Sequence, residues 1–405
     1  MKHYRYVIVG ASIAGLSAVQ GIRSRDPRGE ILVVHGESRL PYKRTQLSKQ
    51  IARGFSGDQL AIHPPDWYSA NGIELLRGTR AISLQPSSRE LALSTEDVVG
   101  YETLLIATGA SPVALAIPGT QHLEYLRDIV QAEAIMRRLK EVDEAVSIGF
   151  GVQGVELADQ FASAGIATTL LGCNDRLMSN CLDAETGRRL EDRAVAAGVR
   201  VVRWGKVREI RREGRRYEVV AEEGEIETGM AAASVGAVPV VDIAVSAGLP
   251  VEEGGQGGVI VQTDMRTGVE GIFAAGDAAA PLPGASWGLW HSAEASGMTA
   301  GVNMAGGDLR PDPKPFRLKC EAFGGWLFSL NYARVSADEQ AEPCLLRNSP
   351  DLYLRVWERE GRTVGALLDL YPRPDPPRTK ALGKQLERLI GEGAGAGDIL
   401  RALGT

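Results

Sequence analysis

The first feature with the spacing for chemistry is a glycine-rich turn at residues 10–15. Gly10, Ser12 and Gly15 fill the pattern G-x-G-x-x-G, with serine at the second position. Small residues there let the backbone approach a pyrophosphate, whose charge is stabilised by the N-terminus of the following helix. Glu37 stands roughly 20 residues beyond the turn, after a second predicted strand, where a carboxylate can bind a ribose. The segment therefore predicts a βαβ unit that binds a dinucleotide.

A second turn of this kind, at Gly149, Gly151 and Gly154, has the complete pattern. An apolar run of strand type precedes it, and an amphipathic helix with Gly165 as its stop follows it. The next predicted strand ends in Gly172, where a nicotinamide-binding fold normally carries Asp or Glu. The phosphate-binding half of a second site is therefore predicted, while the acid that would select the ribose is missing. One such pattern is weak support, and two in one chain are much stronger.

Two further strands are predicted to end in residues suited to a ligand. Residues 101–112 form a strand that ends in Ala-Thr-Gly, so that Thr108 and Gly109 lie where the chain can pass close to a ligand. Residues 268–280 repeat this arrangement with Asp277 at the mouth of a strand. A carboxylate there can accept hydrogen bonds from the hydroxyls of a sugar alcohol, while a neighbouring helix end holds phosphate.

The composition of the 405-residue chain excludes several classes of protein. The 51 acidic and 45 basic residues are well mixed and give a net charge of −6, which indicates neither nucleic-acid binding nor an anionic membrane surface. No secretory leader and no run of about 18 apolar residues are visible, so we expect no membrane span. The four cysteines form no C-x-x-C pair and the five histidines no cluster, so we expect no metal site. Reduced thiols predict a cytoplasmic location.

Together these features resemble the flavoproteins with two dinucleotide-binding domains, the pyridine nucleotide-disulfide oxidoreductase superfamily. The segment LPYKRTQLSK, residues 40–49, resembles the LPYxRxxLSK segment of the branch without a redox disulfide. Disulfide-using relatives carry a cysteine there instead. Residues 288–306 resemble a helix of the same branch, although Ser296 replaces the usual glutamine. That branch includes the NAD(P)H-dependent rubredoxin and ferredoxin reductases and the flavin part of the NADH-dependent nitrite reductases.

The resemblance implies a role for each matching residue. Arg44 is expected beside the FAD phosphates, and Lys49 near the reactive edge of the isoalloxazine. Glu156, just after the second turn, matches a glutamate that often pairs with that lysine, so that Lys49 and Glu156 form the expected catalytic pair. Asp277 is expected at the ribityl chain, and Trp290 is expected to line the flavin.

The resemblance also implies a fold class, which is α/β with two Rossmann-like dinucleotide-binding domains, one inserted in the other. Residues 1–115 and 245–310 are expected to form a discontinuous FAD-binding domain, with an NAD(P)-binding domain over residues 116–244. After a proline-rich linker, residues 311–405 are expected to form a small α+β domain, because strand-like alternation is followed by a final helix.

The implied reaction is hydride transfer from NADH or NADPH to FAD, followed by electron transfer to a small iron–sulfur carrier of the rubredoxin or ferredoxin type. Two other functions stay open, an NAD(P)H oxidase that uses oxygen and a flavoprotein that senses redox state without significant turnover. The chain is expected to act as a monomer or a homodimer, without nucleic acid or membrane partners.

Gly172 leaves the choice of nicotinamide open. An acid at this position would accept hydrogen bonds from the ribose of NADH and repel the 2′-phosphate of NADPH. An arginine usually accompanies NADPH binding, and Arg176 is the nearest candidate in the sequence. Relaxed use of NADH, use of NADPH and a vestigial site are the three possible outcomes, and we expect NADH to be used ahead of NADPH.

Overall fold

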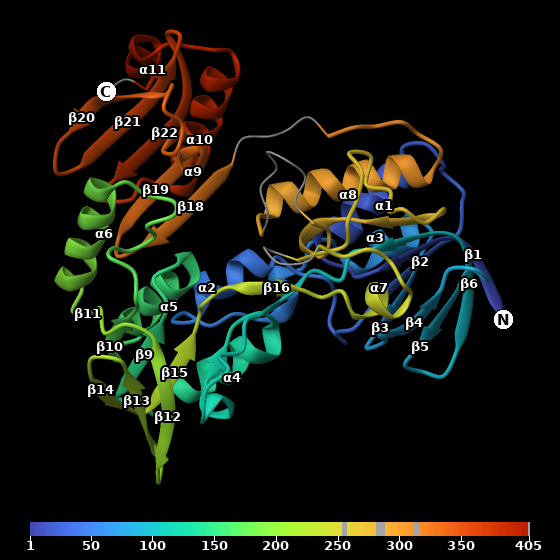
Figure 1. The fold of residues 1–405 in the computed structure, drawn as a ribbon, viewed down its shortest axis with the longest axis horizontal. Coiled ribbons are helices and arrows are strands. Elements are labelled where there is room, and N and C mark those ends of the chain that lie inside the picture. The colour runs from blue at the N-terminus through green and yellow to red at the C-terminus, as the bar shows by residue number, and fades with distance from the viewer. Residues whose placement is uncertain (253–256, 281–287, 312–315, 404–405) are drawn as a thin grey trace. The chain divides into compact units, whose positions relative to one another are not determined.

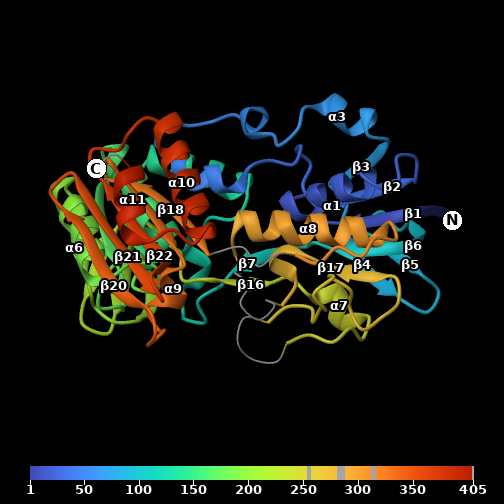
Figure 2. The same cartoon turned by 90° about the horizontal axis from the view of Figure 1, so that it is seen from above.

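The computed structural model describes residues 1–252, 257–280, 288–311 and 316–403 (Figures 1 and 2). Contacts divide the chain into two units, each assembled from separate stretches of sequence. Unit 1 comprises Met1–Gln46, Phe55–Pro112 and Ala237–Lys314. Unit 2 comprises Leu47–Gly54, Val113–Gly236 and Pro315–Thr405.

The main sheet of unit 1 has the strand order β3-β2-β1-β6-β5-β4, and β17 also pairs with β6. The strands are β1 (Lys2–Val9), β2 (Ile31–His35), β3 (Ile73–Arg77), β4 (Ala81–Gln85), β5 (Glu90–Leu93), β6 (Val98–Ile106) and β17 (Ile272–Ala274). Strands β3, β2, β1, β6 and β17 are mutually parallel, whereas β4 and β5 pair antiparallel. This is the arrangement of a Rossmann-like sheet, in which β1 feeds the first glycine turn. A separate antiparallel pair joins β7 (Ala110–Pro112) to β16 (Ala237–Pro239).

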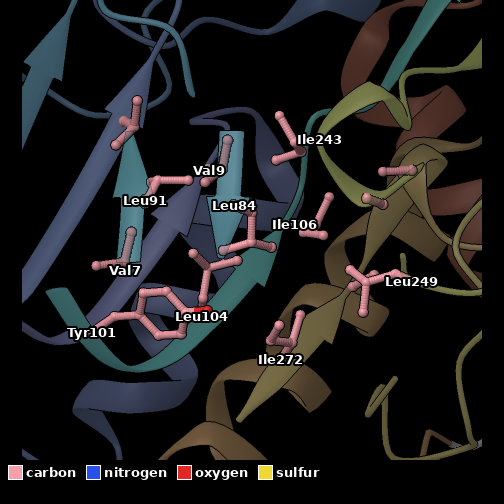
Figure 3. Close-up of a cluster of buried hydrophobic side chains, with 14 of the residues drawn as sticks. Val7, Val9, Leu84, Leu91, Tyr101, Leu104, Ile106, Ile243, Leu249 and Ile272 are labelled. Carbon is pink, nitrogen blue, oxygen red and sulfur yellow. The ribbon is translucent and has the colours of Figure 1, made fainter. Parts of the chain in front are cut away.

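The face of this sheet opposite its long helices is buried by aliphatic side chains. Val7, Val9, Leu104 and Ile106 point from β1 and β6 into a cluster that also contains Leu249 (Figure 3). All of these side chains are buried. Strands that are covered on both faces need such continuous apolar runs in their sequences. The short helix α7 (Asp242–Ser246) adds to the same cluster.

Helices α1 (Ile13–Arg23) and α8 (Trp290–Met304) run side by side on the other face of the sheet (Figures 1 and 2). They approach so closely that a Cβ atom on Gly297 would lie 2.1 Å from the carbonyl oxygen of Ala14, and one on Gly301 would lie 2.0 Å from that of Ala18. Only glycine fits at these two positions of α8. The remaining helical segments of the unit are α3 (Pro65–Ala70), η1 (Arg44–Gln46), η2 (Gly57–Leu60) and η4 (Gly276–Ala278).

Unit 2 contains a second parallel sheet with the order β11-β10-β9-β15-β8. Its strands are β8 (Glu124–Tyr125), β9 (Glu144–Ile148), β10 (Ala167–Leu171), β11 (Arg200–Val202) and β15 (Met230–Ala233). An antiparallel sheet of β12 (Val207–Glu213), β13 (Arg216–Ala221) and β14 (Glu225–Thr228) lies beside it. The helical segments are α2 (Leu47–Gln50), η3 (Thr120–His122), α4 (Ile129–Leu139), α5 (Val152–Ser163) and α6 (Ala184–Ala196).

The C-terminal part of unit 2 is an antiparallel sheet with helices, drawn in orange and red in Figure 1. Its strand order is β18-β19-β22-β21-β20, formed by β18 (Arg317–Ala322), β19 (Gly325–Leu330), β20 (Glu342–Asn348), β21 (Leu352–Arg359) and β22 (Arg362–Leu370). The helices are α9 (Tyr332–Val335), α10 (Pro376–Gly391) and α11 (Ala396–Ala402). The predicted fold class, with two Rossmann-like sheets and a C-terminal α+β part, is confirmed. None of the helices among the described residues is long and apolar enough to cross a membrane.

Buried ion pairs attach the C-terminal sheet to α6. Asp369 on β22 is fully buried and accepts hydrogen bonds from Arg189 at 2.9 Å and from Arg193 at 2.8 and 3.0 Å. Asp183, the residue that caps α6, accepts hydrogen bonds from Tyr353 and Arg355 of β21. A buried carboxylate is tolerated only when it is paired and hydrogen-bonded, so these contacts fix the sheet on the helix.

Replacing Asp369 with alanine should therefore destabilise the chain far more than removing an exposed ion pair. We expect Asp369→Ala to lower the free energy of unfolding by about 3–5 kcal/mol, because two buried guanidinium groups lose their partner. Asp398→Ala, which removes an exposed pair with Arg401 on α11, should change it by at most about 0.5 kcal/mol. Urea unfolding of both variants and the wild type measures the difference, and similar losses in the two variants would contradict the structural role of Asp369.

Candidate functional site

In unit 1 the carboxyl ends of four parallel strands lie in register. Val9 of β1 pairs with Val34 of β2 and with Ile106 of β6, and Ile106 pairs with Ala274 of β17. The segments that follow these ends therefore meet at one edge of the sheet, where ligands bind in open α/β folds. The predicted site residues that lie on these segments are Gly10, Ser12, Gly15, Glu37, Thr108, Gly109 and Asp277.

The first glycine turn is packed backbone against backbone. Gly10 has φ +110°, and a Cβ atom there would lie 2.1 Å from the carbonyl oxygen of Ala107. A Cβ atom on Gly15 would lie 1.9 Å from the carbonyl oxygen of Gly10. Ser12 is the N-cap of α1, yet its side chain makes no capping hydrogen bond. The first-turn amides of α1 are therefore left for an external acceptor, which fits the pyrophosphate of FAD.

Glu37 and Arg44 pair with each other. Arg44 Nη2 contacts Glu37 Oε1, and the hydroxyl of Tyr42 donates to Glu37 Oε2 at 2.7 Å. Burial raises the pKa of Glu37, but the charge of Arg44 and the hydrogen bonds from Tyr42 and Arg44 together outweigh this effect and hold that pKa below its ordinary value. Glu37 is thus an ionised acceptor beside the first turn, as a ribose-binding residue must be. The family resemblance predicted Arg44 beside the FAD phosphates, and nothing in the sequence indicated its pairing with Glu37.

Thr108 and Gly109, which follow β6, form hydrogen bonds with Val240, near the start of the third stretch of unit 1. Thr108 Oγ1 donates to the carbonyl of Val240 at 2.5 Å, and the amide of Val240 donates to the carbonyl of Gly109 at 2.9 Å. Gly109 has φ +76°, a left-handed conformation that favours glycine. These two residues therefore hold the segment around Val240 beside the carboxyl end of β6.

Ser296, the departure from the family pattern, has a structural role that the sequence did not reveal. Its hydroxyl accepts a hydrogen bond from the amide of Gly276 at 3.0 Å and donates to the carbonyl of Ser292 at 2.9 Å. This contact positions the η4 turn, which contains Asp277, against helix α8, which begins at Trp290. Asp277 and Trp290 are both partly exposed and so are accessible to a ligand.

The second glycine turn, in unit 2, has the same backbone packing. A Cβ atom on Gly149, whose φ is +120°, would lie 2.3 Å from the carbonyl oxygen of Ser234. One on Gly154 would lie 2.0 Å from the carbonyl oxygen of Gly149. Gly151, the N-cap of α5, faces open space, since a Cβ atom there would meet no atom within 4 Å. The turn therefore leaves room for a pyrophosphate at the start of α5.

Helix α5 also carries Glu156, whose side chain is only 5% exposed. Glu156 Oε1 pairs with Nζ of Lys49, and Oε2 accepts a hydrogen bond from the hydroxyl of Ser48. Burial lowers the pKa of Lys49, but the charge and hydrogen bond of Glu156, together with Cys320 and Glu321, outweigh this effect and keep that pKa raised. The amide of Ala52 donates to Gln160 Oε1 at 3.1 Å on the same helix. The two predicted catalytic residues are thus brought together by α2 and α5.

A buried cysteine lies close to this pair, although the sequence assigned it no role. Cys320 on β18 is fully buried. Burial, reinforced by the carboxylate of Glu156, raises the pKa of the Cys320 thiol far above its ordinary value. The thiol therefore stays protonated and unreactive. All four cysteines are free thiols, and the described residues contain no group of side chains that could hold a metal ion.

The comparison with known families decides the family of this chain. Residues 4–297 match the family described as pyridine nucleotide-disulphide oxidoreductase. The chain belongs to this family. It is accordingly an FAD-dependent oxidoreductase with a nicotinamide dinucleotide as electron donor, and the family predicted from the sequence is confirmed.

Relatives of known activity agree with this family. The chain is 31% identical over 278 residues to a rubredoxin-NAD(+) reductase of Pseudomonas putida, covering 67% of this chain and 71% of the relative. It is 27% identical over 309 residues to an NADH-rubredoxin oxidoreductase of Clostridium acetobutylicum, covering 76% of each. The crystal structure of a ferredoxin reductase from Rhodopseudomonas palustris has the same fold, with a TM-score of 0.84, 23% identity and coverage of 99% of this chain and 100% of that chain.

A substitution in the first turn tests its fit to FAD. Gly10→Ala should yield protein largely without flavin, because the methyl group overlaps the Ala107 carbonyl and the left-handed backbone alone costs about 1–3 kcal/mol. Gly78→Ala carries the same type of backbone strain, at φ +67°, but its Cβ atom meets nothing within 4 Å. The ratio of flavin to protein absorbance measures the outcome. Normal flavin content in Gly10→Ala, or equal loss in both variants, would contradict this fit.

The Lys49–Glu156 pair makes a prediction about pH. Glu156→Gln should lower the free energy of unfolding of the holoprotein by about 2–3 kcal/mol near pH 7, less than for a wholly buried pair because the Lys49 side chain is 22% exposed. The folded pKa of Lys49 lies above its usual 10.5, so this difference should persist up to that pH and shrink as pH rises through the folded pKa.

Urea unfolding from neutral pH upward measures this difference. The control is Glu392→Gln, which removes an exposed pair with Arg388 and should change stability by at most about 0.5 kcal/mol. A difference that grows in alkaline solution would refute the assignment of the effect to Lys49.

Proposed function

We propose that this chain is a reductase that passes electrons from NAD(P)H, through FAD, to a small redox protein of the rubredoxin or ferredoxin type. The observation that carries the proposal is the Lys49–Glu156 pair. Lys49 lies on the segment where disulfide-using members of the family carry a cysteine, and residues 40–54 contain none. Electrons therefore leave without thiol–disulfide exchange. Relatives named as reductases of rubredoxin, such as that of Pseudomonas putida, support this reading.

The proposed site residues belong to two regions of the chain, one for FAD and one for the nicotinamide dinucleotide. We assign FAD to residues 1–115 and 245–310, where Gly10, Ser12 and Gly15 would face its pyrophosphate and Glu37 its adenosine ribose. FAD supplies the chemistry of accepting a hydride and releasing its two electrons one at a time. Nicotinamide binding is assigned to residues 116–244, and residues 311–405 form the C-terminal α+β domain.

The remaining residues of the proposed FAD site lie at the same strand ends or on the helical segments η1 and α8. Thr108, Gly109 and Arg44 would line the cofactor, Asp277 would accept hydrogen bonds from the ribityl hydroxyls, and Trp290 would lie against the flavin ring. The hydrogen bond from Gly276 to Ser296 supports the assignment of Asp277, because it holds the turn that carries that carboxylate.

Lys49 contributes a positive charge that is fixed in position. Its raised pKa keeps the ammonium protonated at neutral pH, and Glu156 restricts it to one location. A preorganised cation stabilises negative charge that develops beside it without reorganising during the reaction. Gly149, Gly151 and Gly154 precede Glu156 on the same chain segment, so nucleotide binding and the placement of the charge depend on one helix.

The acceptor is proposed to be a small iron–sulfur electron carrier, by analogy with the reductases named above. The cytoplasmic location and the monomeric or homodimeric state predicted from the sequence stay predictions.

An anaerobic titration of the purified yellow protein tests the proposed function. NADH or NADPH should bleach the flavin at about one equivalent, and the reduced protein should then transfer electrons to a rubredoxin or ferredoxin much faster than to oxygen. Dithionite, which reduces flavin without a nicotinamide site, is the control. Bleaching by dithionite but by neither nicotinamide would refute the reductase assignment. Rapid reoxidation by oxygen, without reduction of either protein acceptor, would identify an oxidase instead.

A further inference from the structure

The position of the missing acid is covered by an aromatic ring. A Cβ atom on Gly172 would lie 2.4 Å from Cδ1 and 2.5 Å from Cγ of Phe150. Phe150 is the middle residue of the second glycine turn, between Gly149 and Gly151, and it is only 4% exposed. The ring therefore packs directly on the backbone at the end of β10. Aspartate or glutamate at this position would require the ring to move, so the absence of the acid is built into the packing of the turn.

An arginine lies on the same ring. Arg203 follows β11, and the guanidinium carbon lies 5.6 Å from the centroid of Phe150. Backbone pairing places it there, because the amide of Gly172 donates to the carbonyl of Val202 at 3.1 Å. Arg203 Nε also donates to the carbonyl of Asp175 at 2.8 Å. The Arg203 side chain is 35% exposed, so its guanidinium reaches solvent beside the end of β10.

Two carboxylates near the end of β10, Asp175 and Glu191, are each paired with a guanidinium. Glu191 on α6 pairs with Arg203, and Asp175 pairs with Arg176 at 2.7 Å. Arg176, the candidate named from the sequence, also donates to the carbonyl of Ser179 at 3.4 Å. The end of β10 thus carries a cation on an aromatic platform where related sites carry an anion.

The geometry points to NADPH, which carries a 2′-phosphate on its adenosine ribose, as a substrate of this site at least as good as NADH. Arg203 is the residue that binds this phosphate. This inference rests on the proposed function and names the substrate that the function leaves open. No carboxylate at position 172 repels the phosphate, and a guanidinium is well suited to bind it by charge-assisted hydrogen bonds.

Binding of two small probes tests the inference without any flavin chemistry. Adenosine 2′,5′-bisphosphate and 5′-AMP differ only in the 2′-phosphate, and isothermal titration calorimetry of the FAD-loaded protein measures both. The bisphosphate should bind at least as tightly as 5′-AMP. Arg203→Met, which keeps an apolar stem against Phe150, should weaken the bisphosphate about tenfold, as expected for the loss of one charge-assisted hydrogen bond, and leave 5′-AMP within about twofold.

Matched variants protect this test against effects on folding. Arg208→Met removes another arginine–glutamate pair of unit 2, with Glu222, and should change neither affinity. Glu191→Gln frees Arg203 from its partner and should tighten the bisphosphate without affecting 5′-AMP. If Arg203→Met does not fold, Glu191→Gln still decides the matter, because an unchanged or weaker affinity for the bisphosphate in that variant would overturn the inference.

The outcomes separate this inference from the proposed function. Flavin bleaching by NADH together with tighter binding of 5′-AMP than of the bisphosphate would refute the inference and leave the reductase intact. Binding of neither probe, with no bleaching by either nicotinamide, would overturn both. Efficient bleaching by NADPH that is lost in Arg203→Met and kept in Arg208→Met would establish the role of Arg203.

Discussion

The arrangement of the proposed catalytic groups depends on one buried carboxylate, that of Glu156. A nearly buried negative charge requires a cation and hydrogen-bond donors, and both come from a short stretch, Leu47–Gly54, that leaves unit 1 to join unit 2. Because Glu156 lies in the helix that begins at the second glycine turn, the carboxylate fixes Lys49 relative to the backbone of that turn. Removing the charge would release the lysine. It would also weaken the contacts by which Ser48 and Lys49 hold this stretch on α5.

The C-terminal sheet extends this constraint. Asp369 attaches it to α6, and the amide of Phe323 donates to Asp159 on α5 at 2.7 Å. The second contact lies on the same helix as Glu156, and β18 brings the buried thiol of Cys320 close to the Lys49–Glu156 pair. The sheet is therefore part of the wall around the Lys49–Glu156 pair. The hydrogen bonds of Asp369 and Phe323 hold the sheet in that place.

The local features of this fold were predictable from the sequence, and the long-range pairings were not. The turns at Gly10 and Gly149 were found because a fixed spacing of small residues has a direct backbone cause, which their positive φ values display. Strand alternation likewise predicted β21 and β22. In contrast, the partners of Arg44 and Asp369 depend on side-chain positions from segments distant in sequence. The packing of Phe150 on Gly172 joins two ends of a βαβ unit, and only the missing acid hinted at it. The family resemblance predicted the pairing of Lys49 with Glu156, which residue spacing alone could not.

The close crossing of α1 and α8 has a consequence for how this chain can change over evolutionary time. Gly297 and Gly301 touch the backbone of α1 at Ala14 and Ala18, and Gly21 of α1 touches that of α8 at the carbonyl of Met298, 2.6 Å from where its Cβ atom would be. Neither helix can acquire a larger side chain at these positions without moving the other. One helix starts at the first glycine turn and the other at Trp290, so a shift of either would change the spacing between the two ends of the proposed flavin site. Homologous sequences should therefore keep small residues at these positions on both helices together, even where their surfaces diverge freely.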